Sequence, residues 1–227
     1  MHAEPLRTAA DLAITYLDEI DEAPVFPTVS PEDLRAAIDG PLPTGPTDPS
    51  DVLTELARDV TPGLVRSQGG RYFGFVTGGA QPVAVGADWL AAAWDQNAFS
   101  YVSSPAMSVV EDVTERWLLE LLELPAGARA GFVTGCQMAH VTALAAARHR
   151  VLTDVGWNVT AEGLFGAPPI AVVTGDRRHS TVDRALRLLG LGTGALRLVE
   201  TDDRGRVVPE ALAATLEGID GPAIVVA

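Results

Sequence analysis

The second half of the sequence alternates short apolar runs with helical segments, and this alternation restricts the possible fold more than any other feature. Four apolar runs, mostly rich in β-branched residues, are predicted as strands: 131–133, 170–174, 196–199 and 223–227. Three helical patterns lie between them: 137–155, 181–189 and 209–217. Alternation of this kind is typical of an α/β sheet with helices on its faces, so we expect a mostly parallel sheet here.

The first half is predicted to be mainly helical. Apolar spacing indicates helices at 5–22, 82–98 and 104–124, and Ser30-Pro31 and Ser50 or Asp51 begin two more. The aromatic stretch 71–76 is predicted to be extended. Because residues 1–64 have little core of their own, we expect a helical arm that packs on a partner subunit. Residues 65–227 are expected to form the first part of a large domain.

Composition excludes several classes of function. The net charge of −14 opposes binding to nucleic acid, and no apolar run has the length of a membrane span. A single cysteine, Cys136, rules out an internal disulfide and a cysteine-based metal cluster, and we expect a cytoplasmic protein without a metal. All 16 basic residues other than histidine are arginine, so the chain contains no lysine. Chemistry that needs an amine side chain requires a lysine from elsewhere.

A glycine turn follows the run at 131–133 and leads into the helix at 137–155. The turn is Thr134-Gly135-Cys136-Gln137. Free N–H groups at the start of a helix suit a phosphate, Gly135 allows close approach, and the Thr134 hydroxyl or Gln137 amide adds donors. Many α/β proteins have a purely structural turn of this kind, and the local pattern alone favours that interpretation. Cys136 as a nucleophile is a weaker hypothesis than a small turn residue.

His179 lies just after the predicted strand 170–174. Residues at the carboxyl ends of strands in α/β sheets commonly line the ligand site, where an imidazole can lie against a planar cofactor. The alternative is a residue that merely begins a helix. His140 and His149, nine residues apart, lack an acidic partner for a metal site, and we expect a surface or packing role for them.

These features, in this order, resemble the group II pyridoxal-phosphate (PLP) amino acid decarboxylases. The likeness covers roughly residues 65–227. It rests on seven segments: Arg71-Tyr-Phe-Gly-Phe75, Ala87-Asp-Trp-Leu90, Asp95-Gln-Asn97, Ser104-Pro-Ala106, the helix at 111–125, the turn at 134–137 with Ala-Ala-Arg148, and Asp176-x-x-His179-Ser-x-Val-x-Arg184. The resemblance implies the α/β fold of PLP-dependent transferases of fold type I and a homodimer with shared active sites. Its expected reaction converts an L-amino acid into an amine and CO2.

The resemblance also implies roles for matched positions. Gly135, Cys136 and Gln137 correspond to the turn that binds the PLP phosphate, and His179 to the imidazole that stacks on the pyridine ring near the substrate carboxylate. Four residues correspond to the substrate pocket: Phe75, Val76, Thr77 and Tyr101. Two departures affect these assignments. Gly69-Gly70 replaces the usual His-Pro pair, and Cys136-Gln137-Met138 replaces smaller residues of the turn.

Two alternatives stay open. Another PLP reaction of the same fold, transamination or carbon–carbon cleavage, uses a similar phosphate turn. Because the family's lysine and pyridine-nitrogen aspartate have no counterpart in this sequence, and the sequence stops within an apolar run, we expect a portion of a longer polypeptide. A truncated, non-catalytic half that binds or regulates another protein is the second alternative.

Overall fold

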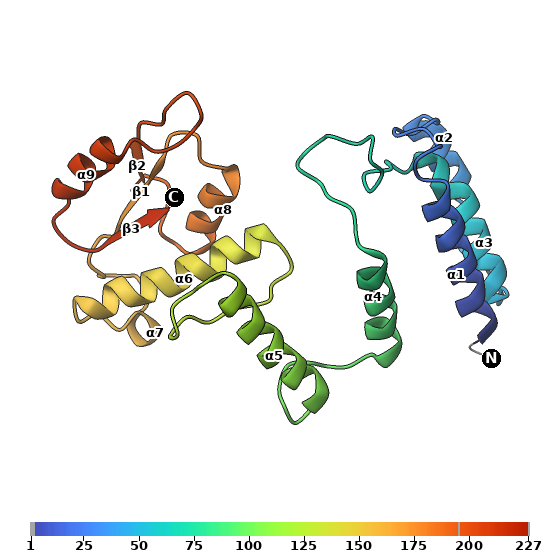
Figure 1. The fold of residues 1–227 in the computed structure, drawn as a ribbon, viewed down its shortest axis with the longest axis horizontal. Helices are drawn as coiled ribbons and strands as arrows, with labels where there is room; N and C mark the ends of the chain where they lie inside the picture. Colours follow the sequence, from blue (N-terminus) through green and yellow to red (C-terminus); the bar gives the residue numbers. More distant parts are fainter. Residues whose placement is uncertain (1–2, 195, 227) are drawn as a thin grey trace. The chain divides into compact units, whose positions relative to one another are not determined.

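The chain forms two compact units, Met1–Asn97 and Ala98–Ala227 (Figure 1). This computed structural model describes residues 3–194 and 196–226. The first unit contains α1 (Ala3–Asp18), α2 (Pro31–Ile38), α3 (Pro49–Val60), the short 3-10 helix η1 (Thr61–Gly63) and α4 (Pro82–Trp94). In it, α3 packs against α1 and α2.

Two helices of this unit begin at local capping signals. The Ser30 side chain accepts a hydrogen bond from the Asp33 amide at 3.0 Å, directly before Pro31. Asp48 accepts one from the Ser50 amide at 2.8 Å, so α3 begins at Pro49, slightly earlier than predicted. Each cap satisfies an amide that the helix itself leaves unpaired. The start expected at Ser30-Pro31 is confirmed.

The first unit has little core, as its sequence indicates. Among its described residues only Arg66 is buried. Its guanidinium donates to the Tyr16 carbonyl at 3.3 Å and lies 4.6 Å from the centre of the Tyr16 ring. A buried cation is stabilised by such a hydrogen bond and by the ring's negative face. Arg66 therefore attaches α1 to the segment that follows η1.

The extended conformation predicted for residues 71–76 is wrong. The segment turns: the Tyr72 amide donates to Gly69 at 3.2 Å and the Thr77 amide to Gly74 at 3.3 Å. Phe75 and Val76 both have a positive φ of 54°. An aromatic run becomes a strand only when a neighbouring strand completes its hydrogen bonds, and the described residues provide none beside it.

The second unit contains a parallel sheet surrounded by helices. Its helices are α5 (Pro105–Leu121), α6 (Cys136–Asp154), α7 (Val159–Glu162), α8 (Ser180–Leu188) and α9 (Pro209–Glu217). Its strands are β1 (Ala171–Gly175), β2 (Leu196–Val199) and β3 (Ala223–Val226), in the order β2-β1-β3. Both neighbours run parallel to β1. The expected α/β architecture with a parallel sheet is confirmed.

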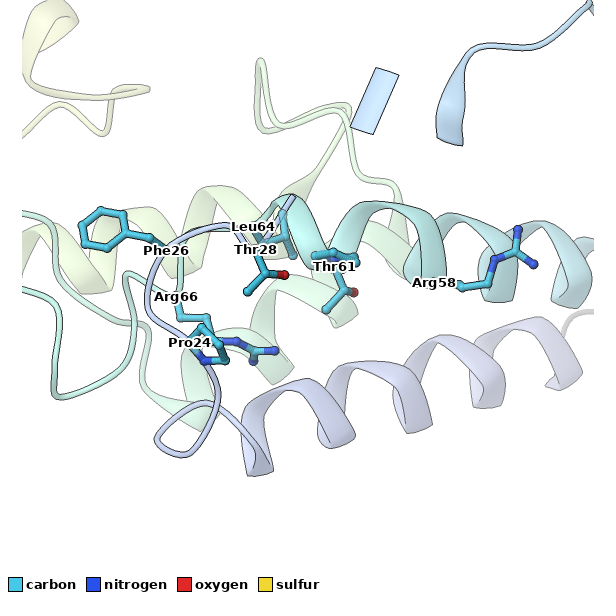
Figure 2. Close-up of a pocket in the computed structure, with 8 residues that line it drawn as sticks. Pro24, Phe26, Thr28, Arg58, Thr61, Leu64 and Arg66 are labelled. Carbon is cyan, nitrogen blue, oxygen red and sulfur yellow. The ribbon is translucent and has the colours of Figure 1, made fainter. Parts of the chain in front are cut away.

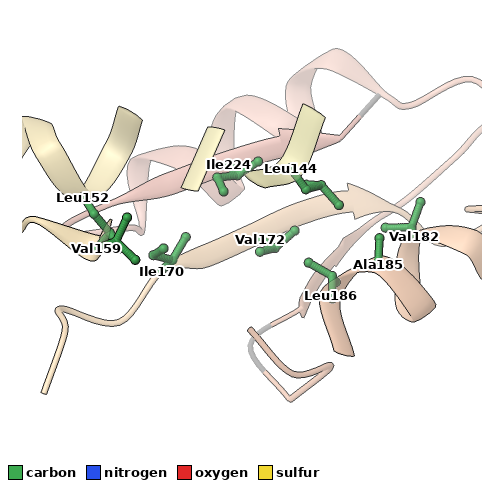
Figure 3. Close-up of a cluster of buried hydrophobic side chains, with 9 residues drawn as sticks. All are labelled: Leu144, Leu152, Val159, Ile170, Val172, Val182, Ala185, Leu186 and Ile224. Atoms are coloured by element: carbon green, nitrogen blue, oxygen red, sulfur yellow. The ribbon is translucent and has the colours of Figure 1, made fainter. Parts of the chain in front are cut away.

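The core lies where α6 and α8 pack beside β1 and β3 (Figure 3). β1 is the central strand, so Val172 and Val173 are fully buried, one toward each face. On α8 the buried positions are Val182, Ala185 and Leu186, which lie on one face of the helix. This packing fixes α6 and α8 relative to the sheet, and it therefore fixes their first residues near the carboxyl end of β1.

The strand predicted at 131–133 is not formed among the described residues. This stretch has the apolar composition of a strand, but it pairs with none of the three strands. A strand exists only when a neighbour accepts and donates its backbone hydrogen bonds.

In the described part of the chain, no helix has the length and apolar character needed to span a membrane.

Candidate cofactor site

The amino terminus of α6 offers unpaired backbone N–H groups. Gly135 caps the helix with φ 156° and ψ 177°, a combination that is essentially restricted to glycine. No side chain accepts a hydrogen bond from the first amides, and the first helical bond joins the Ala139 amide to the Gly135 carbonyl at 3.0 Å. The amides of the first turn are therefore free to bind an anion, and the positive end of the helix dipole favours one.

The amino terminus of α8 is organised around His179. Its Nδ1 accepts a hydrogen bond from the Thr181 amide at 3.3 Å, so His179 is the N-cap of α8. The Thr181 hydroxyl lies 2.8 Å from the same nitrogen. Because Nδ1 accepts from the backbone, the proton of the neutral ring is on Nε2. Arg178 and Asp183 form two contacts, of 2.7 and 3.1 Å, that brace this turn.

The two helix starts are joined directly. The Gln137 side chain donates from Nε2 to the Thr181 carbonyl at 3.2 Å. Helices α6 and α8 also pack along each other. Because Thr181 holds the His179 ring and Gln137 belongs to the turn, the predicted phosphate turn and the predicted imidazole lie in adjacent positions. The structure thus brings together the two features that the sequence analysis singled out.

A cavity of about 220 Å³ opens at the carboxyl end of β1. His140 and His179 line it, together with Thr174 and Gly175 of β1, Val226 of β3, and Thr201, Gly205 and Val207. Arg177 and Arg178 also face it, whereas none of its lining residues is acidic. Arg178 is paired with Asp183 at 2.7 Å, so Arg177 and the two imidazoles are the groups of this lining that favour an anionic ligand.

These residues fit a phosphorylated, flat ligand. The donor set consists of backbone amides at a helix start, hydroxyls, imidazoles and guanidiniums, which are the groups that bind phosphate and carboxylate oxygens. Two buried side-chain atoms, Gln137 Oε1 and Nδ1 of the lining residue His140, have no hydrogen-bond partner among the described residues. A Cβ placed at Gly135 would meet no atom within 4 Å, which leaves open space in front of the turn.

The other predicted site residues, including the turn at 134–137, are not among the residues that line this cavity. Phe75, Val76 and Thr77 belong to the first unit and are exposed, and Tyr101 is exposed in the second unit. Their role in a substrate pocket stays a prediction. Thr134 and Cys136 are exposed in the turn, and Cys136 is a free thiol.

A second cavity, of about 280 Å³, lies in the first unit (Figure 2). It is lined by prolines and by Phe26, Leu64 and Arg66 among others, and none of the predicted site residues contributes to it. Arg58 at its rim bonds to Asp59 at 2.7 Å. Of the predicted site residues, only His179 lines the cavity at β1.

His140, for which a surface or packing role is expected, lines the cavity at β1 with His179. The sequence analysis missed Arg177 and Thr201, which line it as well. The sequence contains a hint for His140. It lies four residues after Cys136, about one helical turn, so both residues share one face of the helix.

The chain is an α/β protein with a free helix start and a capped imidazole at the carboxyl edge of a parallel sheet, which is where phosphorylated ligands commonly bind in this class. Residues 31–226 match the pyridoxal-dependent decarboxylase conserved domain, and the chain belongs to this family. This match confirms the predicted family and its cofactor, pyridoxal phosphate.

The chain is also similar in sequence to curated amino acid decarboxylases. An aromatic-L-amino-acid decarboxylase of Bacillus atrophaeus is 29% identical over 204 residues, which cover 90% of this chain and 40% of that protein. The mouse aromatic-L-amino-acid decarboxylase is 30% identical over 219 residues, with 91% and 44% covered. The chain thus spans less than half of the length of these relatives.

Solved structures confirm the expected fold. The chain superimposes on mouse CSAD with a TM-score of 0.82 at 24% identity, covering 98% of this chain and 47% of that one. It superimposes on Oryza sativa TDC with PLP and tryptamine with a TM-score of 0.82 at 25% identity, covering 96% and 48%. The chain therefore has the fold of about half of each of these structures.

Proposed function

We propose that the full-length protein decarboxylates an L-amino acid to an amine and CO2 with PLP as cofactor. The observation that carries the proposal is the Gln137–Thr181 hydrogen bond of 3.2 Å. It joins the start of α6, with its free amides, to the turn that holds His179, and His179 lines a cavity that has no acidic lining residue. Membership in the pyridoxal-dependent decarboxylase family supports the same assignment.

The residues of the turn would hold the phosphate. In this proposal the amides of Gly135, Cys136 and Gln137 donate to phosphate oxygens, and the Thr134 hydroxyl adds a donor. His179 would contact the pyridine ring and the substrate carboxylate, with its N–H on Nε2 as the available donor. Bound PLP supplies an electron sink for the bond between Cα and the carboxylate. The chain's own task is to bind and orient the reactants.

The chain does not supply the amine that the chemistry needs. Among its 227 residues there is no lysine. The covalent bond to the cofactor therefore requires a lysine from outside this sequence. The aspartate expected at the pyridine nitrogen would come from outside this sequence as well. The proposal accordingly concerns the full-length protein, in which these 227 residues supply the phosphate turn and the imidazole.

The proposal includes a cytoplasmic homodimer with shared active sites. Large apolar side chains support an additional interface, since Trp89, Trp94 and Trp117 are all substantially exposed within this chain. Residues 1–64 would form the arm that packs on the partner subunit. Phe75, Val76, Thr77 and Tyr101 would line the substrate pocket, some of them for the neighbouring subunit.

The test is an assay of the full-length protein with PLP and a panel of L-amino acids that includes aromatic and acidic members. We expect release of CO2 with formation of the matching amine, and no reaction with the D-enantiomer or without PLP. Formation of a keto acid without CO2 would show an aminotransferase instead. Failure to retain PLP at all would favour the non-catalytic half.

A further inference from the structure

His140 is the second imidazole of the cavity at β1, and the function proposed above does not use it. It lies on α6, four residues after Cys136 and three after Gln137, and it lines the same cavity as His179. The two rings come from different helices, which the Gln137–Thr181 hydrogen bond holds together. Among the described residues, Thr181 is the hydrogen-bond partner of His179 Nδ1, and His140 Nδ1 has none.

The two nitrogens of His140 have different surroundings. Nδ1 is buried without a hydrogen-bond partner in the described part of the chain. The residue is nevertheless only half-buried and lines the cavity, and Nε2 is not among the buried unpartnered atoms. Because Nδ1 is buried, Nε2 is the ring nitrogen through which His140 can contact a ligand in the cavity. In the tautomer with its proton on Nε2, this nitrogen is an N–H donor.

His179 presents the same kind of donor. Its Nδ1 accepts from the Thr181 amide, which places the proton of the neutral ring on Nε2 as well. With His140 in the tautomer protonated on Nε2, the cavity thus has two imidazole N–H donors, and its lining adds Arg177, Arg178 and no carboxylate. Asp183 compensates Arg178, and Asp176 accepts from Thr201 at 2.6 Å rather than lining the cavity.

We propose that His140 is a ligand-binding residue that donates a hydrogen bond from Nε2 to an anionic oxygen of the bound ligand. This inference rests on the proposed function, because the ligand belongs to the same cavity. The oxygen belongs either to the phosphate of PLP or to the carboxylate of the amino acid. Both oxygens are anionic hydrogen-bond acceptors, so either one can accept from the His140 N–H.

The experiment compares His140→Leu and His140→Gln in the full-length protein. Leucine fills a similar space without a donor, whereas the glutamine amide places an N–H near the position of Nε2. We measure the Kd of PLP, of pyridoxal and of inorganic phosphate, and the KM of the amino acid. A hydrogen bond to a charged oxygen corresponds to roughly 10-fold or more in affinity, so we expect a loss of about that size with Leu and its recovery with Gln.

The pattern of losses identifies the source of the oxygen. Weaker binding of PLP and inorganic phosphate, with pyridoxal unchanged, assigns His140 to the phosphate. A raised KM with unchanged PLP affinity assigns it to the substrate carboxylate. If His140→Leu binds every probe like the wild type, or if His140→Gln is as weak as His140→Leu, the inference is wrong. If the wild type itself does not bind PLP, the proposed function fails instead.

Discussion

Replacement of His179 by alanine in the full-length protein is expected to lower turnover roughly 10²- to 10⁴-fold, the range for loss of a positioned catalytic imidazole. Retention of PLP should weaken much less. The reason is the division of labour in the site. His179 is held at the cavity by its cap on α8, whereas the donors for the phosphate are the separate amides at the start of α6. Steady-state kinetics and the Kd of PLP provide the two measurements.

Two control variants separate this effect from loss of the helix cap. His179→Ser keeps an oxygen that can accept from the Thr181 amide, so it preserves the cap and should still be nearly inactive. His149→Ala removes an exposed imidazole from α6 and should leave turnover unchanged. Normal turnover of His179→Ala would contradict the assignment of this ring to the reacting ligand.

Replacement of Gly135 by alanine is expected to reduce PLP affinity by at least about 100-fold, because two or more charged hydrogen bonds to phosphate depend on its backbone. Its φ of 156° and ψ of 177° lie in a region that other residues occupy only at a cost of about 1–3 kcal/mol. The Cβ itself meets no atom within 4 Å, so the effect comes from the backbone and not from a clash. Fluorescence titration with PLP and urea unfolding measure the two consequences.

Gly131→Ala is the matched control for this variant. Gly131 lies four residues earlier in the same segment, and its φ is not positive. A Cβ there would meet only the Thr142 methyl at 4.0 Å, an ordinary contact. We expect PLP affinity close to that of the wild type. Equal losses in the two glycine variants would mean that the segment is merely sensitive to substitution, and would contradict a specific phosphate turn at 134–137.

The parts of the fold that the sequence predicted are those with local causes. The start of α2 follows from a serine cap and a proline at the first helical position. β1 follows from a continuous β-branched run, and α8 from its apolar face at Val182, Ala185 and Leu186. In each case the residues that determine the element lie within it, so no knowledge of distant segments was needed.

The two wrong predictions, an extended segment at 71–76 and a strand at 131–133, concern conformations that depend on distant partners. Residues 71–76 and 131–133 have the composition of strands, yet the described residues form no ladder beside either. Composition records how well a side chain fits a sheet but does not supply the neighbouring strand. In the first case the chain closes local turns instead, with Phe75 and Val76 at positive φ.

The candidate site was predictable to a similar extent. The glycine turn and His179 were found because each stands at a junction between a strand-like run and a helix. Their proximity was expected only through the family resemblance, and the structure supplies the Gln137–Thr181 contact that joins them. His140 was not assigned to the site because helical spacing defines which residues share a face, not which face borders a cavity. The net charge of −14 likewise concealed a cavity lined by arginine and histidine.

The most direct measurement is an experimental structure of the full-length protein with PLP bound. We expect the phosphate within hydrogen-bond distance of the amides of Cys136 and Gln137. The pyridine ring should lie against the imidazole of His179 in the cavity at the carboxyl end of β1. A cofactor bound with its phosphate away from this turn, or with its ring out of contact with His179, would contradict the account.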